Sequence, residues 1–225
     1  MELSGCSFMN TIVQTKRNKN LYCKFFKRLL DVILSLVGLI ILLPVLIIIA
    51  ILVRYNLGSP VLFKQKRPGK NEEIFTMFKF RTMSLEMGSD GKLLSDSIRL
   101  TKFGRFLRST SLDELPELFN ILIGDMSIIG PRPLAIQYLP FYTMSERTRH
   151  SVRPGLSGLA QINGRNTATW EERFKYDLEY VNNITFLGDV KIIIQTISKA
   201  FRRVDIGERG VDAPIDFDKY RSNKN

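Results

Sequence analysis

The hydrophobic positions of the chain form one long uninterrupted run near the N-terminus and several shorter periodic segments after it. From Val32 to Val53 the sequence has no charged residue. A helix needs roughly 20 apolar residues to cross the hydrocarbon of a bilayer, so this run is long enough. It is too long for a signal peptide, starts too far into the chain, and has no small-residue cleavage site after it. The pattern therefore predicts a helix in or across a membrane.

Positive residues flank the apolar run on both sides, and such residues mark the cytoplasmic face of a membrane. They are Lys16, Arg17, Lys19, Lys24, Lys27 and Arg28 before the run, and Arg54, Lys64, Lys66, Arg67 and Lys70 after it. A straight span would put one cluster on the wrong face, whereas a helical hairpin keeps both on the same side. Pro44 removes a helical N–H near the middle and favours a bend. Two interpretations stay open on charge alone: a re-entrant helix broken near Pro44, and a span with a mild kink.

Beyond the membrane segment, the pattern predicts a mainly helical α+β domain with a small β element. Two short strands are expected at Val61–Phe63 and Glu73–Phe80, around a basic turn at residues 64–70. Apolar residues at helical spacing predict four helices, which we place at Leu112–Ile123, Leu134–Thr148, Thr169–Asn182 and Asp189–Arg203. The Gly- and Asn-rich stretch Arg153–Asn166 indicates a loop, and the polar tail from Gly207 indicates loose order.

The last predicted helix, Asp189–Arg203, has an apolar stripe and a cationic remainder. The stripe comprises Val190, Ile193, Ile194, Ile197 and Phe201. A cationic amphipathic helix can lie on a membrane surface. Packing of the stripe on the domain core is the more ordinary explanation, and both interpretations stay open.

The net charge of the chain is +11, with a sequence pI of about 9.8. This charge favours polyanionic partners such as nucleic acid, anionic lipid or phosphorylated substrates. The basic residues are dispersed and do not form one face with interleaved aromatic residues, which argues against a nucleic-acid binder. The single histidine, His150, would have to carry any Ser-His-Asp or Cys-His mechanism. We interpret it as a solvated loop residue.

Several basic residues stand in turns beside glycine and proline. These turns are Lys79-Phe-Arg81, Gly130-Pro-Arg132-Pro133, Arg153-Pro-Gly155 and Asn163-Gly-Arg165-Asn166, with Arg105 and Arg108 nearby. Arginine forks bind phosphate oxygens in pairs, and adjacent glycines allow backbone N–H groups to approach a phosphate. A set of such turns could converge on a diphosphate.

The acid pair Asp113–Glu114 has a structural and a chemical interpretation. Ser111 and Glu114 match the capping box S-x-x-E at the start of a helix, and Asp113 suits the positive end of the helix dipole. An ionised carboxylate near bound cations is also a usable nucleophile toward phosphorus. A second acid beside it can hold Mg²⁺. Spacing alone does not separate capping from catalysis.

Five stretches of the sequence carry a resemblance to one family, in the order in which that family has them. They are SPVLFKQKRPG at 59–69, FTMFKFRTM at 75–83, LRSTSLDELPELFNIL at 107–122, GDMSIIGPRPL at 124–134 and RPGLSGLAQINGRN at 153–166. Through them the chain resembles the monotopic phosphoglycosyl transferases of the bacterial sugar transferase family, in the minimal form with a single membrane helix. The resemblance covers nearly the whole chain from Lys24 onward.

The resemblance implies a polyprenyl-phosphate hexose-1-phosphate transferase. Asp113 matches the nucleophile that attacks the sugar-bearing phosphorus of a nucleotide sugar, usually a UDP-sugar, and expels the nucleoside monophosphate. Polyprenyl phosphate, typically the undecaprenyl form, then takes the sugar phosphate from the aspartate. Glu114 matches the partner acid associated with Mg²⁺, and either acid could ligate the ion. The basic residues carried over to the site are Lys79, Arg108 and Arg165, and by motif membership Arg81, Arg132 and Arg153.

The resemblance also implies an organisation and a location. Residues 1–23 would be a cytoplasmic segment, 24–55 the re-entrant membrane helix, 56–206 the catalytic domain and 207–225 a tail. The expected fold is a membrane-associated α+β domain with amphipathic interfacial helices on the cytoplasmic face of the bacterial inner membrane. The partners would be the UDP-sugar, polyprenyl phosphate and membrane lipids, with a homo-oligomer left open. Some small members have Ser-Pro at the helix break, whereas Leu43 precedes Pro44 here.

One rival function remains from the sequence, a non-catalytic interaction protein anchored in the membrane. It explains the basic flanks of the apolar run, but it does not explain five separate motif stretches.

Overall fold

The structure is a computed structural model that describes residues 21–164, 168–202 and 216–223. Short 3-10 or π helices are labelled η. The elements up to the middle of the chain are η1 (Tyr22–Phe26), α2 (Lys27–Leu57), β1 (Leu62–Pro68), η2 (Lys70–Glu72), β2 (Ile74–Phe80), α3 (Asp96–Arg99), α4 (Lys102–Ser109), η3 (Leu112–Glu114) and α5 (Glu117–Ile123). The later elements are β3 (Ser127–Ile129), η4 (Ile136–Phe141), α6 (Met144–Arg147), η5 (Thr148–Ser151), β4 (Gly155–Ser157), α7 (Leu159–Asn163), α8 (Trp170–Asn182), α9 (Phe186–Arg202) and α10 (Phe217–Ser222).

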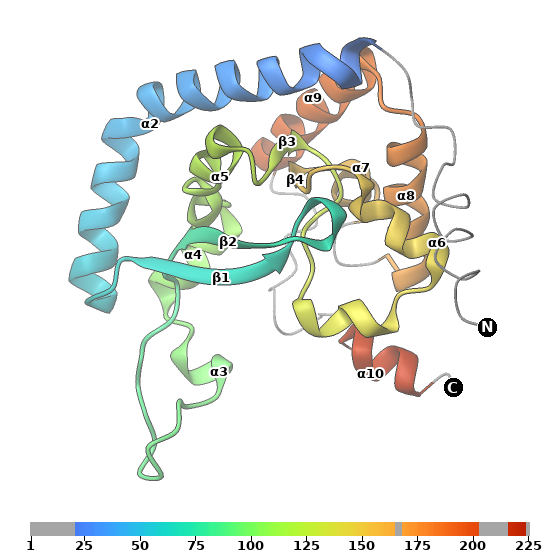
Figure 1. Cartoon of the computed structure of the whole chain (residues 1–225). Helices are drawn as coiled ribbons and strands as arrows, with labels where there is room; N and C mark the ends of the chain where they lie inside the picture. The colour runs from blue at the N-terminus through green and yellow to red at the C-terminus, as the bar shows by residue number, and fades with distance from the viewer. Residues whose placement is uncertain (1–20, 165–167, 203–215, 224–225) are drawn as a thin grey trace.

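The apolar run lies within α2, so the predicted helix is confirmed. Together with η1 it is long and apolar enough to cross a membrane, and only 11% of its most apolar window is buried. Figure 1 shows α2 running along the top of the molecule and then turning down its left side. Pro44 lies inside this helix, where its missing N–H leaves the carbonyl of Ile40 without a helical donor and favours a bend.

Partly buried polar contacts attach the first half of α2 to the rest of the fold. The Arg28 guanidinium donates to the carbonyl oxygens of Ile121 (2.6 Å) and Leu122 (2.9 Å), at the end of α5. The Asp31 carboxylate accepts from the Ile128 N–H at 3.0 Å. The buried Asp189 carboxylate, from α9, accepts from Lys27 Nζ at 2.7 Å. These contacts fix α2 against α5, β3 and α9.

β1 and β2 form an antiparallel hairpin that runs below α5 in Figure 1, with Leu62 paired to Phe80 and Pro68 to Ile74. The predicted basic turn at 64–70 is wrong, because residues 64–68 continue the strand and only η2 makes the turn. β3 and β4 pair in parallel. β4 and α7 both fall in the stretch that the sequence indicated as loop, so that prediction is also wrong.

One predicted helix is confirmed as a single continuous helix, and two others are divided into shorter elements. α8 matches its predicted range, with Thr169 as N-cap and Glu172 completing a capping box. The predicted helix at Leu134–Thr148 is instead divided into η4, α6 and the start of η5, with Pro140 inside η4. The segment Leu112–Ile123 is likewise η3 followed by α5, because Pro116 stands between them.

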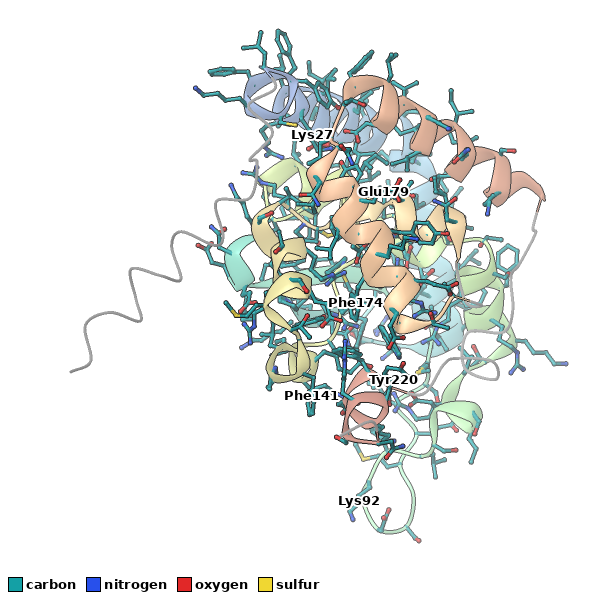
Figure 2. All side chains as sticks on the ribbon, turned by 90° about the vertical axis from the view of Figure 1, so that its right-hand side faces the viewer. Lys27, Lys92, Phe141, Phe174, Glu179 and Tyr220 are labelled. Atoms are coloured by element: carbon teal, nitrogen blue, oxygen red, sulfur yellow. The ribbon has the colours of Figure 1, made fainter. Side chains whose placement is uncertain are left out.

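The C-terminal residues add an aromatic cluster to the core. Tyr138, Tyr142, Trp170, Phe174 and Phe217 are all buried together. Phe217 is fully buried and belongs to α10, which lies below α8 in Figure 2. Loose order was therefore the wrong prediction for the tail at residues 216–223, while residues 207–215 lie outside the described part.

α9 turns only part of the predicted apolar stripe outward, because Ile193 packs against the buried core cluster. Ile194 is 61% exposed and Ile197 is 51% exposed, whereas Asp189 and Ile192 are buried. Both views place α9 beside the first half of α2 at the top of the molecule (Figures 1 and 2). Packing on the core is therefore confirmed for the Ile192–Ile193 part of α9, while Ile194 and Ile197 remain exposed.

Candidate active site

Asp113 and Glu114 lie in η3, between α4 and α5, and both are buried. Ser111 has a φ of 56° in the left-handed region, and its side chain makes no capping hydrogen bond. The predicted capping box is therefore wrong. A capping serine needs an extended backbone to direct its oxygen at the N–H groups of the first turn. Ser111 thus contacts Glu114 only through its backbone carbonyl, which accepts from the Glu114 N–H at 3.2 Å, and the Glu114 carboxylate contacts basic side chains instead.

Lys79, near the end of β2, bridges two carboxylates. Its Nζ lies 2.8 Å from Glu114 Oε1 and 3.1 Å from Glu117 Oε1. The buried Asn120 side chain fixes the strand that carries Lys79, because its Oδ1 accepts from the Phe78 N–H at 3.0 Å and its Nδ2 donates to the Thr76 carbonyl at 2.7 Å. These hydrogen bonds fix the position of the β1–β2 hairpin relative to α5, next to Glu114 and Glu117.

Arg132 is the second cation on Glu114. Its Nη2 lies 2.5 Å from the same Oε1 atom that Lys79 contacts. The charge of Glu114 raises the pKa of Arg132. A third of the Arg132 side chain remains exposed while its guanidinium pairs with Glu114.

The glycines of the basic turns allow close backbone packing. The Gly130 N–H donates to the Ser157 carbonyl at 2.9 Å, and the Gly155 N–H donates to the Pro131 carbonyl at 3.0 Å. A β carbon on Gly155 would lie 2.1 Å from the Gly130 nitrogen. These N–H groups are already used, so the hypothesis that they bind phosphate is wrong for both residues. Instead, the two hydrogen bonds join the turn at Gly130–Pro133 to the segment at Gly155–Ser157, next to Arg132.

Arg108 is held near the acids by α4. Its Nε donates to Thr82 Oγ1 at 3.0 Å. α4 packs closely against Thr82, which follows β2. A β carbon on Gly104 would lie only 1.8 Å from the Thr82 carbonyl oxygen. α4 also contacts η3, so Arg108 stands at the edge of the segment that carries Asp113.

The remaining predicted basic residues occupy other places. Arg81 is buried and donates to the Leu57 and Ser59 carbonyls, at the end of α2. Arg153 Nε donates to the Gly124 carbonyl at 2.7 Å, beyond the end of α5. The structure thus gives both guanidinium groups backbone partners. Arg165 lies outside the described residues.

Glu117 is a third carboxylate in the site, and sequence reasoning assigned it no role. It is 2% exposed, and burial raises its pKa to about 7 against the opposing effect of Lys79. The sequence could have indicated that Glu117 lies near Asp113, because the two are four residues apart in the predicted helix and residues i and i+4 share a helix face.

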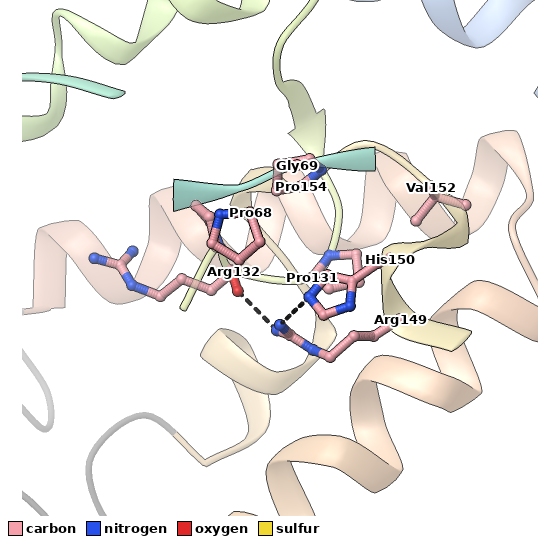
Figure 3. A pocket seen from close by; sticks show the side chains of 9 residues that line it. Pro68, Gly69, Pro131, Arg132, Arg149, His150, Val152 and Pro154 are labelled. Carbon is pink, nitrogen blue, oxygen red and sulfur yellow. Dashed lines mark hydrogen bonds between the residues drawn. The ribbon is translucent and has the colours of Figure 1, made fainter. Parts of the chain in front are cut away.

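His150 is buried, so its interpretation as a solvated residue is wrong. Its Nε2 lies 3.5 Å from Arg149 Nη1, and its ring packs edge-on against Tyr142. Burial and the neighbouring arginines lower its pKa to about 3, which keeps the ring neutral. Figure 3 shows Arg149 between the His150 ring and the Arg132 carbonyl, in a small hollow lined also by Pro68, Pro131 and Pro154.

The carboxylates suit a metal only in part. Among the residues that the structure describes, no group of three or more His, Cys, Asp or Glu side chains could hold a metal ion. Mg²⁺ commonly takes one or two protein carboxylates and completes its shell with substrate phosphates and water. Asp113 and Glu114 provide that number of oxygen-bearing groups. The pair therefore matches Mg²⁺ in the number of protein ligands, while Lys79 and Arg132 already contact Glu114 Oε1.

Comparison with known proteins matches most of the chain to one family. The profile described as bacterial sugar transferase matches residues 22–203. An uncharacterized sugar transferase of Bacillus subtilis, EpsL, is 49% identical over 173 residues, which are 77% of this chain and 86% of that protein.

Two longer relatives carry more specific names. A UDP-glucose:undecaprenyl-phosphate glucose-1-phosphate transferase of Klebsiella pneumoniae is 43% identical over 78% of this chain and 40% of its own length. An undecaprenyl-phosphate galactose phosphotransferase of Salmonella typhimurium is 36% identical over 80% of this chain and 41% of its own length. The chain spans about two fifths of each.

Proposed function

The chain belongs to the bacterial sugar transferase family, and from that premise we propose that it transfers a sugar-1-phosphate from a UDP-sugar to polyprenyl phosphate. The reaction would initiate an exopolysaccharide, capsule, O-antigen or glycoconjugate. The observation that carries the proposal is the convergence of Lys79 and Arg132 on one oxygen of Glu114, beside Asp113. Two relatives act on undecaprenyl phosphate by name, which supports the choice of acceptor.

In the first step, an Asp113 oxygen attacks the sugar-bearing phosphorus of the donor. The bond from that phosphorus to the bridging oxygen breaks, and uridine monophosphate leaves with the electron pair. In the second step, an oxygen of polyprenyl phosphate attacks the same phosphorus and the Asp113 carboxylate is released. Positioning and charge neutralisation provide most of the catalysis of phosphoryl transfer.

The cations of the site have separate tasks in this scheme. Arg132, partly exposed, contacts the donor diphosphate, because an arginine fork matches phosphate oxygens. Lys79 neutralises and orients Glu114, which it contacts at 2.8 Å. By the family resemblance, Arg108 and Arg165 are assigned the remaining phosphate contacts. Asp113 and Glu114 would hold Mg²⁺, which when bound neutralises the diphosphate and its leaving group.

The membrane arrangement follows from α2 and α9. We propose that α2 is re-entrant, entering and leaving on the cytoplasmic face of the inner membrane, with its bend at Pro44. The basic clusters on both flanks support this topology. The exposed Ile194 and Ile197 of α9, beside α2, support its placement in the membrane interface. The site would then face the phosphate of a lipid-borne acceptor.

The experiment uses the full chain purified in detergent, with a panel of UDP-sugars, Mg²⁺ and undecaprenyl phosphate. Uridine monophosphate release is expected for at least one donor, and Asp113→Asn should lower it to the background rate, because the amide cannot act as the nucleophile. Asp96→Asn, an exposed acid on α3, is the matched control and should retain the wild-type rate. Full turnover by Asp113→Asn would contradict the covalent mechanism.

A further inference from the structure

Arg149 is enclosed deep in the fold, behind the Pro131-Arg132-Pro133 turn. Its side chain is 2% exposed. The rings of Tyr142 and Phe174 flank the guanidinium, with centroids 5.8 and 5.9 Å from Cζ. A guanidinium in this position cannot contact a substrate, so any effect on the reaction has to pass through other residues.

The guanidinium of Arg149 connects α8 to the Arg132 backbone. Its Nε and Nη2 donate to Asp177 Oδ2 at 2.9 and 2.8 Å. The same Nη2 donates to the Arg132 carbonyl at 2.7 Å, a contact drawn in Figure 3. Asp177 is 5% exposed, so the charge of each partner is neutralised by the other inside the protein. A lone buried charge here would be strongly destabilising.

The Arg132 backbone is thereby restrained on both sides. Pro131 and Pro133 restrict the φ angles around it, and the Pro131 carbonyl accepts from the Gly155 N–H. The Arg132 side chain extends away from Arg149 in Figure 3 and reaches Glu114 Oε1. Because Arg149 holds the Arg132 carbonyl, it also fixes the backbone position from which the Arg132 side chain extends to Glu114.

We propose that Arg149 and Asp177 are positioning residues, which hold the Arg132 carbonyl so that the Arg132 guanidinium meets Glu114 and the donor diphosphate. The inference rests on the proposed transferase function. A displacement of about 1 Å in a catalytic group can cost up to about 100-fold in rate. The effect should therefore appear in kcat for monophosphate release.

A double-mutant cycle tests this inference, because residues that act through one another are not additive. Arg149→Lys keeps a positive charge for Asp177 but lacks the fork that spans both acceptors. In the wild-type background, it is expected to lower the single-turnover rate of monophosphate release by about tenfold. In the Arg132→Gln background, it should lower the remaining rate by less than about twofold.

Two further variants separate positioning from folding. The double variant Arg149→Met with Asp177→Leu removes both buried charges together. Proteins often keep their stability when a buried ion pair is replaced by apolar residues of similar size. The double variant should keep the thermal midpoint while losing the same rate as Arg149→Lys. Arg147→Lys is the matched control, since Arg147 binds Glu72 and the Leu139 carbonyl instead of Arg132. It should leave the rate within about twofold.

The outcomes distinguish this inference from the function on which it rests. An equal fold loss in both backgrounds, or an unchanged rate in Arg149→Lys, would overturn the positioning role. A wild-type chain with no Asp113-dependent monophosphate release would overturn the proposed function itself.

Discussion

Replacing Glu117 by Gln should stabilise the protein at neutral and alkaline pH. Burial raises the pKa of this carboxyl from 4.5 to about 7, so the folded chain retains a proton that the unfolded chain loses. Stability from this group is present at acid pH and falls as the pH rises from about 4.5 to 7. The gap corresponds to about 3 kcal/mol, at about 1.4 kcal/mol for each pKa unit. Gln has the same size and no charge to bury.

The assay is thermal unfolding of the detergent-solubilised chain at pH 5 and pH 8. At pH 8, Glu117→Gln should unfold about 6–12 °C above wild type, as about 3 kcal/mol implies for a chain of this length. At pH 5, the two should unfold within a few degrees of each other. Glu73→Gln changes an exposed acid beside β2 and serves as the control, with no change expected at either pH. A Glu117→Gln midpoint at or below wild type at pH 8 would refute the reasoning.

Three other predictions follow from contacts in and around the site. Lys79→Met should lower monophosphate release by about 100-fold, since it leaves two buried carboxylates facing each other, while Lys64→Met on the exposed part of β1 should not change the rate. Gly104→Ala should lower the free energy of unfolding by about 1–3 kcal/mol in denaturant titration, because its β carbon would overlap the Thr82 carbonyl. Asp189→Asn should cost about 3 kcal/mol and expose the start of α2 to limited proteolysis, because Lys27 loses its carboxylate partner.

The sequence allowed prediction of the elements whose own residues determine them. α2 contains the long uncharged run Val32–Val53, and α8 begins at a Thr169 cap that its own Glu172 completes. The same type of pattern at Ser111 misled, since Ser111 adopts a left-handed backbone and does not cap. There the tertiary contacts of Glu114 with Lys79 and Arg132 dominate over the local signal. A capping pattern in the sequence therefore does not decide from which donor a carboxylate accepts.

The site was predictable in its residue types and not in its pairings. The resemblance named Lys79, Glu114 and Arg132, which the structure brings together. It also named Arg81 and Arg153, whose guanidinium groups bind backbone carbonyls at helix ends. No local pattern marks an arginine as buried, because burial depends on segments far apart in the chain. Arg149 and Asp177, 28 residues apart, were missed for that reason.

The covalent aspartate is the central claim, and capture of the intermediate tests it most directly. The purified chain is incubated with Mg²⁺ and a UDP-sugar labelled in its sugar-bearing phosphate, without acceptor, then denatured and digested. The account predicts up to one label per chain, on the peptide that contains Asp113, and loss of that label when undecaprenyl phosphate is added. Turnover by a chain that never carries label, or labelling of Asp113→Asn at the wild-type level, would contradict it.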